Sequence, residues 1–152
     1  MPMIFVGIPV WAKQNFVEGA YVFGMVTAAY GMGAFLGAIS AGYLKGPDDK
    51  NLIPYMFWAY VFSGSTLALI VFYKAYWWAM LLFFIAGGFD TYFYVHFTTW
   101  LQRITPESLL GRVMSVLMLM SMGLLPVADG IMGFAIDFSL NLTMVILSLI
   151  HI

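Results

Sequence analysis

The stretch AGGFDTYFYVHFTTW, residues 86–100, places an acid and a histidine within one of the most apolar parts of the sequence. A charged side chain at the centre of a bilayer costs at least about 2.5 kcal/mol, so such residues tend to face a partner, a cavity or a transport pathway. A carboxyl group in surroundings of low dielectric constant can exchange a proton near neutral pH. Asp90 therefore predicts proton exchange or attraction of a cation. The alternative is a structural hydrogen bond from a neighbouring helix, for which tyrosine is a suitable donor.

Helical geometry separates the acid from the histidine. At 3.6 residues per turn, Asp90 and His96 lie on different faces of one helix, so we do not expect them to pair within it. Tyr94 and His96 join Asp90 as candidates for a substrate or proton pathway, although an aromatic face can also hold a histidine with no direct role. The face of Asp90 also carries Phe93, Phe97 and Leu101, and the face of His96 carries Tyr92, Thr99 and Arg103.

Other kinds of chemistry find little support in the sequence. It contains no H-E-x-x-H, G-x-S-x-G or G-x-x-x-x-G-K-[ST] motif, so we expect no enzyme. Two histidines and no cysteine do not make a convincing metal centre, and no cofactor is predicted. The methionines of VMSVLMLMSM are typical of flexible packing. A net charge of −1 provides no basic field for nucleic acid.

The composition is that of a membrane protein. Hydrophobic residues make up 63% of the chain and charged residues 9%, whereas soluble domains average about 45–50% and about 25%. Six basic and seven acidic residues cannot cover a water-facing surface. The lipid bilayer is therefore the expected environment and partner of the chain.

Long segments with few charges predict where the chain crosses the bilayer. A crossing helix needs about 20 apolar residues, and it must satisfy its own backbone hydrogen bonds. We therefore expect an all-α membrane protein, with one domain over residues 1–152 that is incomplete because the chain begins and ends inside the membrane. The predicted full spans are residues 19–44, 51–73, 75–102 and 113–136, and the predicted partial spans are 2–12 and 138–152.

Basic residues predict the orientation. Lys45 and Lys50 lie in the loop KGPDDKN, and Arg103 and Arg112 lie in the loop RITPESLLGR. Two spans separate these loops, so they share one side of the membrane. Because cytoplasmic loops carry an excess of lysine and arginine, we expect this side to face the cytoplasm of a bacterial cell membrane.

Two spans carry residues that can affect packing and movement. The first contains small residues at helical spacing, as in GAFLG at 33–37, which allow close helix packing or a sliding surface. The fourth contains Pro126, which should kink the helix, and Asp129 one turn later. A broken helix beside an acid is a device of transporters. The alternative is a packing kink with Asp129 hydrated near the outer surface.

Two stretches resemble the C-terminal half of a major facilitator superfamily transporter, in the branch of macrolide-efflux proteins and enterobactin exporters. GMVTAAYGMGAFLGAISAGYLKG is similar to the glycine-rich eighth helix of that branch. WLQRITPESLLGRVMSVLML is similar to the loop that leads to the eleventh helix. The superfamily's loop motif is only weakly echoed by Gly42, Lys45, Gly46 and Lys50, and Asp90 matches no motif of the family. The residues that carry the second match are Gln102, Pro106, Gly111, Arg112 and Val113.

The resemblance implies a mechanism. Two six-helix halves would rock around a site at the membrane midplane, so this half of the bundle needs an N-terminal transporter half as its partner. The implied function is proton-coupled export of an amphipathic small molecule, such as a drug or a siderophore. Lys45, Arg103 and Arg112 would then make cytoplasmic loop contacts, although Arg112 also fits a simple positive-inside anchor. The alternative is a complete four-helix protein that acts as an oligomeric transporter or a scaffold.

Overall fold

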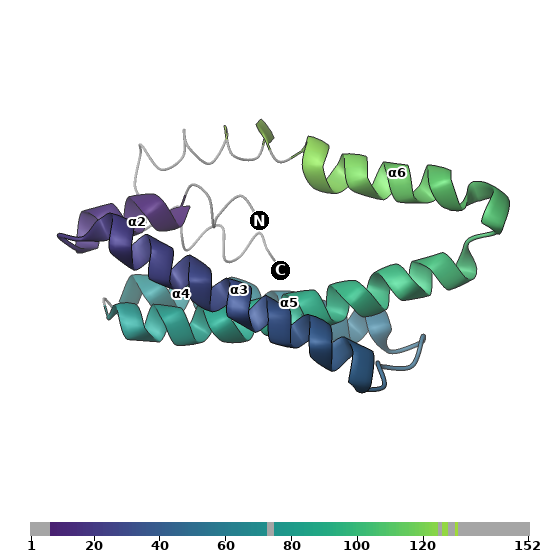
Figure 1. Cartoon of the computed structure of the whole chain (residues 1–152), viewed down its shortest axis with the longest axis horizontal. Helices are drawn as coiled ribbons and strands as arrows, with labels where there is room; N and C mark the ends of the chain where they lie inside the picture. Colours follow the sequence, from purple (N-terminus) through teal and green to yellow (C-terminus); the bar gives the residue numbers. More distant parts are fainter. Residues whose placement is uncertain (1–6, 73–74, 125, 128–129, 131–152) are drawn as a thin grey trace.

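The structure is a computed structural model that describes residues 7–72, 75–124, 126–127 and 130. These residues form five α-helices in chain order, and the described part of the chain contains no strand. The class of all-α protein predicted from the sequence is therefore confirmed for these residues. The helices are α2 (Gly7–Asn15), α3 (Gly19–Tyr43), α4 (Leu52–Phe72), α5 (Tyr76–Ile104) and α6 (Glu107–Gly123), as Figure 1 shows.

Among the residues that the structure describes, two helices are long and apolar enough to cross a membrane. These are α3, with 25 residues, and α5, with 29 residues. In α4 the described apolar stretch runs over Leu52–Phe62. At 1.5 Å per residue, α5 is about 43 Å long, which exceeds the hydrocarbon thickness of about 30 Å. The ends of α5 therefore extend to the level of the lipid headgroups when its centre lies at the midplane.

The bounds of α6 differ from the prediction. Residues 107–112 were expected in a loop, but α6 begins at Glu107. Pro106 precedes the helix with φ −56°, and the acid of Glu107 lies in the first turn, where it interacts favourably with the helix dipole. The prediction was wrong because charges such as Arg112 mark the edge of the apolar segment, whereas the helix itself begins at its capping residues.

The longest helices, α3 and α5, run in the same direction and pack along each other with α4 beside α5. Glycines allow their backbones to meet. A Cβ atom at Gly33 would collide with the carbonyl of Phe84, and one at Gly37 would collide with the carbonyl of Gly88. Close backbone approach at small residues is how helices associate in lipid, where the hydrophobic effect between them is weak. GAFLG is therefore a packing motif in this fold.

The best-buried apolar side chains gather where α2 meets the beginnings of α3 and α5. Trp11 and Ala12 of α2 pack here with Val26 of α3 and Phe83 of α5. Gly19 permits the tight turn between α2 and α3, because a Cβ atom there would meet the backbone of Lys13. This end of the bundle is thereby held together by side-chain packing.

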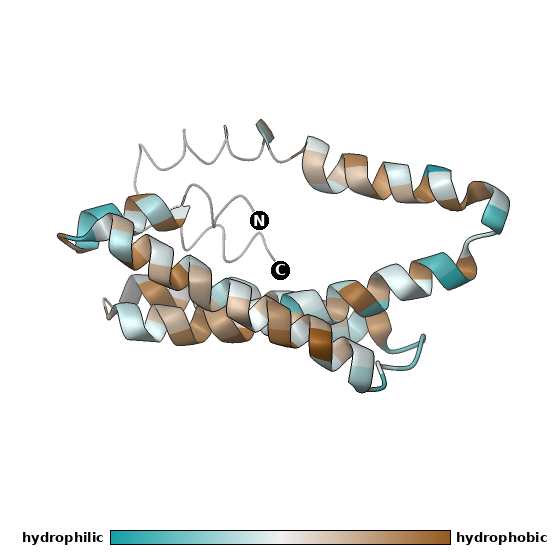
Figure 2. Cartoon of the chain, viewed as in Figure 1, coloured by the Kyte–Doolittle hydropathy of each residue, from teal (hydrophilic) through white to brown (hydrophobic). Residues whose placement is uncertain are grey.

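Much of the outer surface is apolar. Phe35 is 66% exposed, Trp58 67% and Leu119 69%. Figure 2 shows that hydrophobic residues cover the middle of the helices and that hydrophilic residues gather at the helix ends and connections. Apolar patches of this extent are rare on monomeric soluble proteins and fit contact with lipid or with further helices.

Candidate functional site

Asp90 lies at the centre of α5 and contacts the neighbouring helix α3. The hydroxyl of Tyr30 donates a hydrogen bond to Asp90 Oδ2 over 3.3 Å. Gly87 allows this approach, because a Cβ atom at that position would collide with the Tyr30 carbonyl. Asp90 is half-buried and is the middle residue between Tyr76 and Ile104. The acid thus has a tyrosine donor on another helix, which is the structural contact considered from the sequence.

Further tyrosines surround this acid. Tyr60 of α4 lies within electrostatic range of Asp90, Tyr30 and Tyr94. Tyr60 is 38% exposed and Tyr94 is 50% exposed, so neither residue is fully enclosed by the described part of the chain. We call Asp90 and these three residues the tyrosine–aspartate cluster. It joins three helices near their centres, and its hydroxyl groups can donate to a carboxylate or relay a proton.

The tyrosines on α3 and α4 were not among the residues selected from the sequence. Tyr30 and Tyr60 stand in apolar segments that contain several other aromatic residues. Tyr21 and Tyr55 lie near the starts of the same helices, and only the register between helices brings Tyr30 and Tyr60 close to Asp90. A polar side chain near the centre of each span was the available signal.

His96 lies on another part of α5 and packs against the loop between α3 and α4. Its ring meets that of Tyr92 at a centroid distance of 4.6 Å with 72° between the planes. The Tyr92 hydroxyl donates a hydrogen bond to the Lys45 carbonyl over 3.5 Å. A Cβ atom at Gly46 would collide with the His96 ring. Tyr92 and His96 therefore hold the loop against α5, and the predicted shared face of these two residues is confirmed.

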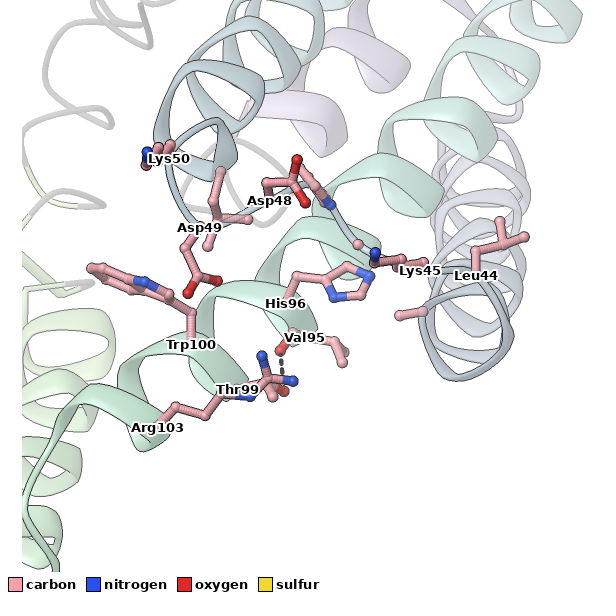
Figure 3. Close-up of a pocket in the computed structure, with 14 residues that line it drawn as sticks. Leu44, Lys45, Asp48, Asp49, Lys50, Val95, His96, Thr99, Trp100 and Arg103 are labelled. Carbon is pink, nitrogen blue, oxygen red and sulfur yellow. Dashed lines mark hydrogen bonds between the residues drawn. The ribbon is translucent and has the colours of Figure 1, made fainter.

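A polar cavity of about 730 Å³ lies between this loop and α5, and we call it the loop cavity. Asp48 and Asp49 lie on the loop side, whereas His96 and Arg103 belong to α5 (Figure 3). His96 Nε2 is buried without a hydrogen-bond partner among the described residues, and Arg103 lies within electrostatic range of His96. The charged residues that line the cavity are Lys45, Asp48, Asp49, Lys50 and Arg103.

The predicted loop residues divide between two places. Lys45 and Arg103 line the same cavity, which confirms that KGPDDKN and the end of α5 lie at one end of the bundle. Arg112 is exposed on α6 and does not line the cavity.

Pro126 follows the end of α6 at Gly123, and residues 126–127 are again helical. Asp129 lies outside the described residues.

Substituting Gly46 tests how the loop is held. Gly46→Ala should displace the His96 ring and loosen the loop, because the added methyl group needs the space that the ring occupies. An overpacking cost of about 1 kcal/mol would raise the population of the locally opened loop about fivefold. Limited trypsin digestion in detergent should then cleave after Lys45 and Lys50 faster by about that factor.

Gly42→Ala is the matched control, because no atom lies within 4 Å of a Cβ atom built there. Its cleavage rate should equal that of the unchanged chain. Equal rates for Gly46→Ala and Gly42→Ala would show that the contact between Gly46 and His96 does not hold the loop.

Comparison with known proteins identifies one family. A family model described as a transmembrane secretion effector of the major facilitator type matches residues 3–149, which is nearly the whole chain. No curated protein and no solved structure matches the chain.

Proposed function

The chain belongs to the transmembrane secretion effectors of the major facilitator superfamily, and from this membership we propose that it is the C-terminal half of a proton-coupled exporter. The exported molecule would be amphipathic and small, of the drug or siderophore kind. Membership of a transporter family points to transport and not to catalysis. Proton coupling, the substrate class and the missing half are parts of the proposal.

The observation that carries proton coupling is the position of Asp90. The acid lies at the middle of α5 and accepts a hydrogen bond from Tyr30 of α3. A carboxylate there attracts a proton or a cation, whereas its neutral form removes that attraction. Tyr30 donates to the charged form through a strong hydrogen bond, which weakens on protonation because the acceptor loses its charge. Loading and release of one proton would thus change how α3 and α5 interact at the site.

The need for a second half follows from the mechanism of the superfamily. Alternating access rocks two six-helix halves around a site near the midplane. Three of the described helices, α3, α4 and α5, provide the tyrosine–aspartate cluster. Exposed Tyr60 and Tyr94 would face the substrate path between the halves. The cluster needs a second wall to enclose a substrate, and the N-terminal half would supply it.

The proposal is tested by transport in everted membrane vesicles. Vesicles that contain the chain together with its N-terminal half should accumulate an amphipathic cationic dye when the interior is acidified, and a protonophore should abolish the accumulation. Dye movement that persists with the protonophore would contradict proton coupling.

A second arm tests the need for the missing half. Proteoliposomes that contain only residues 1–152 should show no dye movement above that of empty liposomes. Transport by these residues alone would instead favour the oligomeric four-helix transporter, and it would overturn the requirement for a second half.

A further inference from the structure

The wall of the loop cavity contains a buried polar atom that no described residue satisfies. His96 lines the cavity, and its Nε2 atom is buried without a hydrogen-bond partner among the described residues. Because the great majority of buried polar side-chain atoms in proteins have a partner, an atom of this kind needs an explanation, and a bound molecule is one. The neutral ring carries an N–H on one of its nitrogens, so Nε2 can donate to an oxygen of a ligand.

The α5 wall of the cavity adds a second donor on the same face. Arg103 follows His96 by seven residues, which is about two helical turns. Side chains on a helix lean toward its beginning, and Figure 3 shows the Arg103 side chain running back along α5 toward Thr99. A guanidinium group matches the oxygens of a phosphate through paired N–H donors. The α5 wall therefore suits an anionic oxygen group between Arg103 and His96.

The loop wall of the cavity carries acids, which a simple anion does not satisfy. The Asp49 carboxyl extends from the loop toward α5 in Figure 3, and Asp48 lines the same cavity. Carboxylates repel an anion but accept hydrogen bonds from an ammonium group. Trp100 also lines the cavity, and an aromatic face attracts an ammonium group as well. A ligand that fits both walls therefore carries a positive group in addition to its anionic one.

The net charge of the cavity distinguishes between such ligands. With His96 neutral, its charged side chains leave one net positive charge; they are Lys45, Lys50, Arg103, Asp48 and Asp49. A phosphate monoester carries nearly two negative charges at neutral pH, since its second pKa is about 6. An ammonium group on the same molecule reduces this to about one negative charge, which balances the cavity. An amino acid, or a phosphodiester with an ammonium group, has no net charge and leaves the cavity unbalanced.

The size and depth of the cavity also fit a small soluble molecule. Its volume of about 730 Å³ is typical of small-molecule sites and exceeds that of a single ion. Arg103 follows Asp90 by thirteen residues, or about 20 Å, and half of the hydrocarbon thickness is about 15 Å. The Arg103 end of the cavity therefore reaches the level of the headgroups when Asp90 is at the midplane.

We propose that the loop cavity binds an aminoalkyl phosphate, with its phosphate between Arg103 and His96 Nε2 and its ammonium group at Asp48 and Asp49. The ligand would join the α3–α4 loop to α5. The site shares no residue with the tyrosine–aspartate cluster, so the inference does not depend on proton coupling or on transport.

The imidazole signals of the chain, labelled with ¹⁵N-histidine and held in lipid-free detergent, test the binding. The sequence has two histidines, so the variant His151→Gln assigns the signal of His96. O-phosphoethanolamine should shift that signal saturably. Ethyl phosphate, which lacks the ammonium group, and ethanolamine, which lacks the phosphate, should each bind at least tenfold more weakly. Equal affinity for O-phosphoethanolamine and ethyl phosphate, or no saturable shift, would overturn the proposal.

The same headgroup also occurs in a lipid, phosphatidylethanolamine, as a diester without net charge. A short-chain phosphatidylethanolamine in the same detergent should bind more weakly than O-phosphoethanolamine, because it leaves the cavity unbalanced. Tighter binding of the lipid would overturn the assignment to a soluble phosphate monoester and indicate a site for a lipid headgroup.

Variants locate the two ends of the ligand. Arg103→Gln should weaken binding of both phosphates at least tenfold, whereas Arg112→Gln on exposed α6 should not change it. Asp48→Asn with Asp49→Asn should abolish the preference for O-phosphoethanolamine over ethyl phosphate, and Glu107→Gln, outside the cavity, should keep it. An unchanged preference in the double variant, or equal loss in either control, would contradict the assignment. The comparison of ligands on the unchanged chain decides the question if a variant fails to fold.

Discussion

Asp90→Asn is expected to lower efflux driven by a pH gradient at least about tenfold when the chain works with its second half. The variant removes the charge of the acceptor; a hydrogen bond to a charged group contributes about 1.5–3 kcal/mol, and each 1.4 kcal/mol is a factor of ten. Asparagine keeps the size of the side chain, so Tyr30 still meets an oxygen at this position. It cannot change its charge, and the remaining transport should therefore lose its dependence on the pH gradient.

The effect of Tyr30→Phe on transport should lie between that of Asp90→Asn and that of no change. The variant keeps the ring that packs against Phe83 at a centroid distance of 6.4 Å but removes the donor to Asp90. Transport should remain coupled to protons, because the carboxyl group is still present. Its pH profile should move, since the charged form of Asp90 loses a hydrogen bond that stabilises it.

The measurement is initial efflux rate against external pH in vesicles with matched amounts of protein. Glu107→Gln is the control, because it removes an exposed carboxylate from the first turn of α6, far along the chain from the cluster. It should leave the rate and the profile unchanged. An Asp90→Asn variant with an unchanged rate and an unchanged profile would leave the hydrogen bond from Tyr30 as a structural contact alone.

Gly33→Ala is expected to destabilise the bundle by about 1–3 kcal/mol, the usual cost of overpacking a close-packed interface. The added Cβ atom would collide with the Phe84 carbonyl, which belongs to the backbone of α5 and cannot rotate away. The helices α3 and α5 must then separate along the segment that also holds Gly37 and Gly88. Because Tyr30 and Asp90 lie on this pair of helices, the same change should weaken their hydrogen bond.

Gly31→Ala is the matched control, two residues away on the same helix. A Cβ atom at Gly31 meets nothing within 4 Å. Alanine favours a helix over glycine by about 1 kcal/mol, so this variant should be neutral or slightly stabilised. Unfolding in mixed micelles, followed by circular dichroism, should therefore separate two substitutions of identical chemistry. Equal stability of the two variants would show that the approach of Gly33 to Phe84 does not hold the bundle together.

The helices themselves were largely predictable from the sequence. The predicted spans 19–44, 51–73 and 75–102 end within two residues of α3, α4 and α5, because apolar segments of this length must form helices to satisfy their backbone in lipid. The start of α6 was not predicted, since Glu107 and Arg112 set its first turns apart from the long apolar segment that follows. The different faces of Asp90 and His96 followed from helical geometry alone.

Local sequence therefore determined where the helices run, which residues share a face and that Asp90 needs a polar neighbour. Only the tertiary structure decided that this neighbour is Tyr30, that Gly33 and Gly37 face α5 while Gly31 does not, and that Lys45 meets Arg103 in one cavity. The physical reason is that helical periodicity is set by hydrogen bonds four residues apart. The register between two helices is instead set by side chains and backbones that lie tens of residues apart in the chain.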